Sequence, residues 1–284
     1  MKFTKLLKYD LKNGFKQNSI KVLFFLFTIA TILCVDFYLT KQKTYLLDGE
    51  VPIATFLDYA CYLFGGMAEF IPALGESFEF PVRWFLLNLI LFYGTLHYPV
   101  RDLFSLGINI LPRSEKRILW WFSKCVWIII YTVFSYLIIY GAILLFCVFS
   151  SEDISFLITP DFLNRIMDAR TTFQEFDNSV VYAILILPLI ITIGLNMIQM
   201  LLSLFLKPLL SYLVIIVFCL AGTYFNTGII WSNYAMSLRS AFVVFDGYSL
   251  NVGIVLGVTI IIATMVIGGL IFRKINILEK DENY

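Results

Sequence analysis

Six long apolar runs, separated by short polar segments, constrain this chain more than any other feature. They cover residues 22–40, 84–100, 125–149, 179–206, 208–228 and 250–272. About 20 apolar residues of helix cross the roughly 30 Å hydrocarbon core of a bilayer. Lipid offers the backbone no hydrogen-bond partners, and runs of this length lack the alternating pattern of barrel strands. The sequence therefore predicts an all-α integral membrane protein with six transmembrane helices, forming one domain over residues 1–284.

The basic residues predict how the chain is oriented in the membrane. If the N-terminus is cytoplasmic, the inner segments hold most of the 21 Lys and Arg residues. The outer segments then hold Lys41, Lys43, Arg83, Arg165, Arg170 and Arg239, and more acidic than basic side chains. Because positive residues resist translocation, we expect a multi-pass protein with both termini in the cytoplasm. Lys41 and Lys43 follow the first run where a signal peptide would have a cleavage site, so this run is expected to be a retained helix.

Residues 2–17 form an amphipathic pattern before the first apolar run. On a helical wheel the lysines occupy most of one half and Phe3, Leu6, Leu7, Leu11 and Phe15 the other. Such a helix lies in the headgroup plane with its lysines near anionic lipid, or alternatively docks on protein. Immediate continuation into a membrane span favours the interfacial helix. Asp10 interrupts the apolar side of the pattern.

The segment between the second and third runs is the inner region most suited to a partner. Residues 101–113 read as a short, semi-apolar helix with a basic shoulder, which a cytosolic protein could grip. The candidate contact residues are Leu103, Phe104, Leu106, Ile108, Ile110, Arg113 and Lys116. A membrane-surface loop anchored by Trp120 and Trp121 is the alternative.

Polar side chains inside the runs are the candidates for a substrate path. Thr192, Asn196, Gln199 and Ser203 are spaced to share one helical face, where they either join neighbouring helices or line a path. Asp36 is the only acid within a run, and an intramembrane carboxylate suggests a function. Its position near the outer end and near Lys41 favours snorkelling or local pairing instead.

Three further segments carry structural expectations. The long outer segment 41–83 is expected to form short helices on or in the outer leaflet, and the segment 226–249 to re-enter it. The last run carries a stripe of small residues typical of close helix packing, which comprises Gly253, Gly257, Thr264 and Gly268.

No enzymatic signature is present in the sequence. It has no G-x-x-x-x-G-K-[ST] phosphate cradle, no H-E-x-x-H zinc pair and no G-x-S-x-G nucleophile turn. The single histidine, His97, would have to carry any imidazole chemistry alone, and a solvated or hydrogen-bonded side chain is the commoner role. The five cysteines show no C-x-x-C spacing. We therefore expect no catalytic residue, no metal site and no disulfide, and nothing indicates a nucleic-acid partner.

The order of these parts resembles the permease subunits of type-2 ABC transporters, in particular bacterial exporters of peptides and antimicrobials. The resemblance rests on the amphipathic start Phe3 to Lys12, the six runs, the inner segment from Leu111 to Leu119 with Lys124 opening the third run, and the semi-apolar segment before the sixth. It implies that residues 2–17 are an elbow helix, 101–113 a coupling helix and 226–249 a re-entrant segment.

The resemblance also implies partners and a cofactor. A chain without a nucleotide-binding sequence would work with separate ABC ATPase subunits, which hold ATP and Mg²⁺, and with a second permease subunit, identical or different, in the bacterial cytoplasmic membrane. It would itself bind no cofactor and catalyse no reaction. The enlarged segment 41–83 departs from the compact first loop of the family and favours a peptide or other amphipathic cargo. A membrane immunity or sensor protein without transport remains an alternative, and so does an intramembrane enzyme built on Asp36 and the polar stripe.

Overall fold

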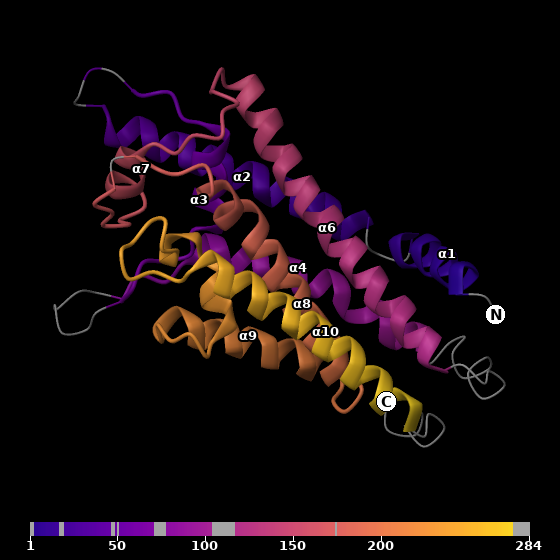
Figure 1. The fold of residues 1–284 in the computed structure, drawn as a ribbon. Coiled ribbons are helices and arrows are strands. Elements are labelled where there is room, and N and C mark those ends of the chain that lie inside the picture. Colours follow the sequence, from indigo (N-terminus) through magenta and orange to yellow (C-terminus); the bar gives the residue numbers. More distant parts are fainter. Residues whose placement is uncertain are drawn as a thin grey trace.

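The computed structural model describes residues 3–16, 20–46, 49, 51–70, 78–103, 117–173 and 175–274, and this part of the chain is helical with no strand. Figure 1 shows the helices as an elongated bundle. In chain order the elements are α1 (Phe3–Gly14), α2 (Ile20–Thr44), α3 (Phe56–Phe64), α4 (Val82–Asp102), α6 (Arg117–Phe149), α7 (Pro160–Arg165), the π-helical turn η4 (Tyr182–Ile186), α8 (Leu187–Leu202), α9 (Pro208–Tyr224), the 3₁₀ turns η5 (Trp231–Ala235) and η6 (Ser237–Arg239), and α10 (Leu250–Lys274).

Four helices in the described part are long and apolar enough to cross a membrane: α2, α6, the continuous η4–α8 helix and α10. The other two predicted spans coincide with shorter or more polar helices. α9 has 17 residues, which at about 1.5 Å per residue cover roughly 25 Å. α4 has 21 residues but includes Asn88, His97, Arg101 and Asp102. The all-helical fold is confirmed, whereas six spans and their orientation stay predictions.

The helix α8 lies in the interior of the bundle, where it packs against α4, α6, α9 and α10. Glycines on α10 allow this helix to approach α8 and α6 closely. A Cβ atom on Gly257 would lie 2.5 Å from Ile190 Cγ2, and one on Gly268 would lie 2.0 Å from Trp121 Cζ2. The predicted stripe of small residues is therefore a packing face within this chain, directed at α8 and α6.

The bundle has two distinct ends. At one end, which we call the α1 end, Trp120 near the start of α6 stacks on Phe272 near the end of α10 with ring centroids 4.8 Å apart, and α1 packs on α6 beside them. In Figure 1, α1 and the last turns of α10 both lie at this end. At the other, the α3 end, lie α3, α7, η5 and η6. The two ends of the described chain therefore face the same side of the bundle.

Instead of lying at the surface, the helix α3 is enclosed by protein. All nine of its residues are buried, and it packs against α2, α4 and α6. A reciprocal capping box starts it: the Asp58 amide donates to Thr55 Oγ1 at 3.1 Å, and the Thr55 amide donates to Asp58 Oδ2 at 3.0 Å. The Thr159 amide and hydroxyl also donate to Asp58. Burial nevertheless raises the pKa of Asp58 to about 6, because desolvation outweighs these hydrogen bonds.

Candidate functional site

Three charged side chains meet in the protein interior at the α1 end. Lys124 Nζ lies 2.5 Å from Asp10 Oδ1 and 2.6 Å from Asp102 Oδ2. The side chains of Lys124 and Asp10 are 0% exposed and that of Asp102 is 6% exposed. We call Asp10, Asp102 and Lys124 the ionic cluster. It joins α1, the last residue of α4 and the beginning of α6.

Polar and aromatic neighbours complete the surroundings of the ionic cluster. The Tyr98 hydroxyl donates to Asp10 Oδ1 at 2.9 Å, and the Ser123 hydroxyl donates to Asp10 Oδ2 at 2.5 Å. Trp120 Nε1 donates to Asp102 Oδ2 at 3.1 Å. The Lys124 ammonium lies over the rings of Tyr98 and Trp120, 4.5 and 5.1 Å from their centroids. These contacts replace part of the hydration that the three charges lose on burial.

The position of Asp10 follows from how α1 docks on α6. Gly14 lies against the indole of Trp127, where a Cβ atom would come within 2.2 Å of Trp127 Nε1. One residue later, the Phe15 ring packs on Tyr131 and Phe134. The Asp10 carboxylate, one helical turn before Gly14, therefore faces into the bundle. Asp10, which interrupts the apolar side of α1, thus makes its contacts inside the bundle. Protein holds α1 in place, in addition to any lipid beneath it.

The ionic cluster is unbalanced in charge, and two of its members flank the segment 104–116. Two carboxylates and one ammonium give it a formal charge of −1 when all are ionised. Burying ions costs several kcal/mol each unless their partners compensate, so removal of one member leaves the others exposed to that cost. Asp102 and Lys124 flank the residues 104–116, and Asp10 ties both to α1. A displacement of this segment would therefore be transmitted to α1.

Most of the predicted partner-contact residues lie outside the described part of the chain. Phe104, Leu106, Ile108, Ile110, Arg113 and Lys116 belong to this group. Leu103 is described, and its side chain is 5% exposed within the apolar cluster that also contains Trp120, Trp121 and Phe272. The predicted coupling role of this segment stays a prediction.

The predicted polar stripe on α8 is buried and hydrogen-bonded to other helices. Thr192 shares a 2.8 Å hydrogen bond with the Tyr136 hydroxyl of α6. Asn196 Oδ1 accepts from Thr95 Oγ1 of α4 at 2.8 Å, and Asn196 Nδ2 donates to Thr132 Oγ1 of α6 at 3.0 Å.

Further along the same face, Gln199 Nε2 donates to the Phe92 carbonyl of α4 at 3.0 Å, while Ser203 donates to the Met200 carbonyl within its own helix. Gln199 Oε1 is buried without a hydrogen-bond partner. In this conformation the stripe joins α8 to α4 and α6. A role in a substrate path stays a prediction and would require these helices to separate.

Asp36 lies apart from the polar stripe and is half exposed near the α3 end of α2. It accepts a 2.7 Å hydrogen bond from the Tyr62 hydroxyl and lies 3.8 Å from Arg83, whose guanidinium covers the Tyr62 ring. Lys41, the neighbour expected to pair with it, instead forms a buried ion pair with Glu152. Glu152 also accepts from the Ala54 amide and so connects the segments before α3 and after α6.

The possible metal ligands among the described residues are dispersed. None of them forms a group of three or more His, Cys, Asp or Glu side chains able to hold a metal ion. His97 lies on α4 beside Tyr93, with ring centroids 5.6 Å apart. A comparison with protein-family models and with curated proteins found no match.

Sequence reasoning alone missed the ionic cluster. The sequence places Lys124 at the start of the third run and Asp102 in the semi-apolar helix expected over 101–113. The available signal was the presence of single charges on otherwise apolar helical faces, of which Asp10 was the clearest. Their pairing is set by how distant segments pack.

Proposed function

We propose that this chain is the membrane-spanning subunit of an ATP-driven exporter of the ABC type. The observation that supports this most is the ionic cluster, because it ties an N-terminal amphipathic helix to both flanks of the segment 104–116. In the proposal, that segment receives a separate ATPase in the cytoplasm. The resemblance of the sequence to type-2 permeases supplies the class of partner.

In the proposed mechanism, this chain converts movement of the ATPase into movement of its helices. A push or pull on residues 104–116 acts on the end of α4 at Asp102 and on the start of α6 at Lys124. Through Asp10, both helices move with α1. Because the three charges are buried, separating them is costly, so the α1 end moves as one body. The helices α4 and α6 also hold the polar stripe on α8, so their displacement reaches the interior of the bundle.

The proposal requires a physical contact between residues 104–116 and an ATPase. Replacing Leu106, Ile108 and Ile110 together by Asp should abolish copurification of an ABC ATPase with the affinity-tagged chain from its native membrane. Charged side chains would remove the apolar surface that the partner buries. ATPase identity is read by mass spectrometry and by ATP hydrolysis in the eluate.

A matched control separates a specific contact from a general effect of acidic charge. Phe205 is an exposed apolar residue in the turn between α8 and α9, at the same end of the bundle. The Phe205→Asp variant should retain the ATPase. If no ABC ATPase copurifies with the unmodified chain, or if the triple variant retains it, the exporter proposal fails and a membrane sensor or immunity protein becomes the better account.

A further inference from the structure

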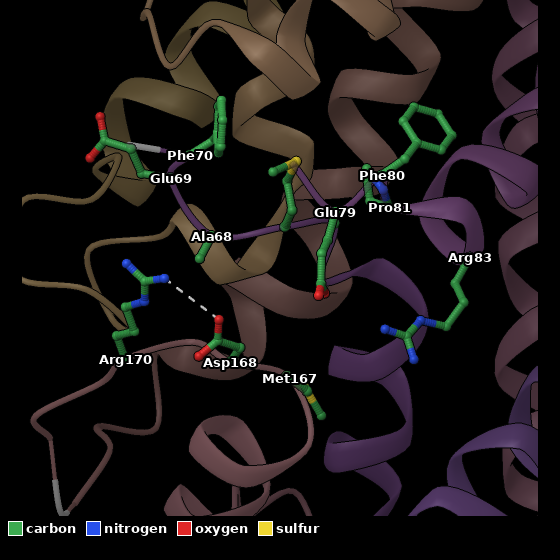
Figure 2. Close-up of a pocket in the computed structure, with 12 residues that line it drawn as sticks. Ala68, Glu69, Phe70, Glu79, Phe80, Pro81, Arg83, Met167, Asp168 and Arg170 are labelled. Atoms are coloured by element: carbon green, nitrogen blue, oxygen red, sulfur yellow. Dashed lines mark ion pairs between the residues drawn. The ribbon is translucent and has the colours of Figure 1, made fainter. Parts of the chain in front are cut away.

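A polar pocket of about 310 Å³ opens at the α3 end of the molecule (Figure 2). Its walls come from three separate stretches of chain, 66–70 after α3, 79–83 at the start of α4, and 167–170 after α7. This size suits a side chain or a short terminal group of a larger ligand and lies at the lower end of the range for ligand sites.

Hydrogen bonds and a buried arginine hold the first wall in place. Arg239 Nε donates to the Met67 carbonyl at 3.1 Å, and Arg239 Nη1 donates to the Gly222 carbonyl at 2.7 Å and Asn233 Oδ1 at 2.8 Å. Burial lowers the pKa of Arg239 to about 10, which leaves it protonated at neutral pH. The wall is therefore tied to the end of α9 and to η5.

Left-handed backbone marks two of the three walls, and it is strained only in the wall that carries Asp168 and Arg170. Asp168 and Arg170 have φ values of 48° and 54°, in the left-handed region that side-chain-bearing residues seldom adopt, and Gly66 has a φ of 71°. The strained wall is braced locally, because Asn164 Oδ1 accepts from the Thr171 amide at 2.8 Å and the Ala169 amide donates to the Leu163 carbonyl at 2.9 Å. Strain of this kind is concentrated at ligand sites and active sites. The shape of the pocket is thus built into the fold.

Ion pairs neutralise some of the charged side chains that line the pocket. The Arg83 guanidinium lies 3.9 Å from the centroid of the Tyr62 ring and pairs with Asp36. Arg170 lies 3.7 Å from Asp168. Among the residues that the structure describes, Glu79 forms no ion pair, and Figure 2 shows its carboxylate extending into the space between the walls. Glu69 lies at the rim. The pocket therefore presents one exposed carboxylate, that of Glu79, without an ion-pair partner among the described residues.

Apolar residues line the same pocket as this carboxylate. They are Met67, Phe70, Phe80, Pro81 and Met167. A carboxylate in a pocket with apolar walls favours a cation carried on an apolar body, since the cation gains a charge-assisted hydrogen bond and the body buries apolar surface.

We infer that this pocket binds the ammonium or guanidinium group of a cationic amphipathic peptide, with Glu79 as its counter-ion. This inference deepens the proposed function, on which it rests only for naming the peptide as cargo. The binding itself needs no ATPase. The pocket would hold a lysine side chain or the N-terminus while the remaining peptide lies along the surface of the α3 end.

The test measures peptide binding to the full-length chain in phosphatidylcholine nanodiscs, without any ATPase. The probe is a fluorescein-labelled synthetic peptide of alternating Lys and Leu, followed by fluorescence anisotropy. We expect Glu79→Gln to weaken binding about tenfold or more, the usual effect of losing a charged hydrogen-bond partner. The same peptide with acetylated lysines should bind the unmodified protein no better than it binds the Glu79→Gln variant.

Glu175→Gln is the matched control, because Glu175 is an exposed acid at the same end that does not line the pocket. It should change the affinity by less than about twofold at physiological salt, where screening over about 8 Å weakens distant charges. Equal losses of peptide affinity in the two variants would show that a diffuse acidic field, and not the pocket, attracts the peptide. An unchanged affinity in Glu79→Gln would refute the site. A positive result without ATPase copurification would keep the site and reject the exporter, so the two proposals fail separately.

Discussion

Replacing Lys124 by Met tests whether the ionic cluster is as dry and as tightly paired as the structure indicates. The methionine keeps most of the side-chain volume but leaves the carboxylates of Asp10 and Asp102 close together without a cation. Breaking a buried pair by removing one partner costs about 3–5 kcal/mol. We expect Lys124→Met to lie at the upper end of this range, since one ammonium serves two carboxylates and the formal charge changes from −1 to −2.

The excess of carboxylates in the ionic cluster leads to a second expectation. Asp10→Asn lowers the magnitude of the formal charge from one to zero and leaves the pair between Lys124 and Asp102 intact. Its loss of stability should therefore be smaller than that of Lys124→Met, although both variants remove one ionised group. A double variant with Lys124→Met and Asp10→Asn should be more stable than Lys124→Met alone, because only one buried carboxylate remains.

The assay is thermal unfolding of the purified protein in detergent, followed by tryptophan fluorescence, together with limited trypsin cleavage at the lysines of α1. Loss of the cluster should free α1 and speed this cleavage. Lys12→Met is the control, because Lys12 is an exposed lysine of the same helix and should change stability by less than about 0.5 kcal/mol. If Lys124→Met unfolds at the same temperature as Lys12→Met, with α1 still protected, the reasoning is refuted.

Two further predictions concern packing within the bundle. Asn196→Leu removes hydrogen bonds to α4 and α6 and should cost about 1–2 kcal/mol of stability, as measured by thermal unfolding. The figure combines roughly 0.6 kcal/mol per interhelical bond with the cost of the groups left unpaired. Unchanged stability with reduced transport would assign Asn196 to a path instead. Gly268→Ala should lower the unfolding temperature because its methyl group meets the Trp121 ring, whereas Gly141→Ala, which meets nothing within 4 Å, should not. Equal effects of the two alanines would show that α10 does not pack on α6 as described.

The helices were predictable because their signal is local. Long apolar runs mark the positions of α2, α6, α8 and α10, and the amphipathic wheel marks α1. The spacing of Thr192, Asn196, Gln199 and Ser203 places polar groups at positions that are buried on α8 or just after its end. It left their role open, because a polar face that joins helices and one that lines a path have the same spacing.

Long-range pairing was not predictable from the same information. Asp10 stood out on its helix, but its partners Tyr98 and Lys124 lie 88 and 114 residues away. Asp36 and Lys41 are five positions apart, a separation that does not bring side chains together on a helix, so each found a distant partner instead. Short helices were expected on or in the outer leaflet over 41–83, whereas α3 is enclosed by protein, where the capping box and Thr159 satisfy its polar start.

The central claim, that residues 104–116 meet an ATPase in the cytoplasm, depends most directly on which side of the membrane the α1 end faces. This can be measured by labelling introduced cysteines with a membrane-impermeant maleimide, since all five native cysteines are buried. Lys12→Cys reports on the α1 end and Glu175→Cys on the α3 end. The account predicts that intact cells label Glu175→Cys, and that Lys12→Cys reacts only after the membrane is permeabilised. Labelling of Lys12→Cys from outside, with Glu175→Cys protected, would place residues 104–116 beyond the reach of cytoplasmic ATP and contradict the account.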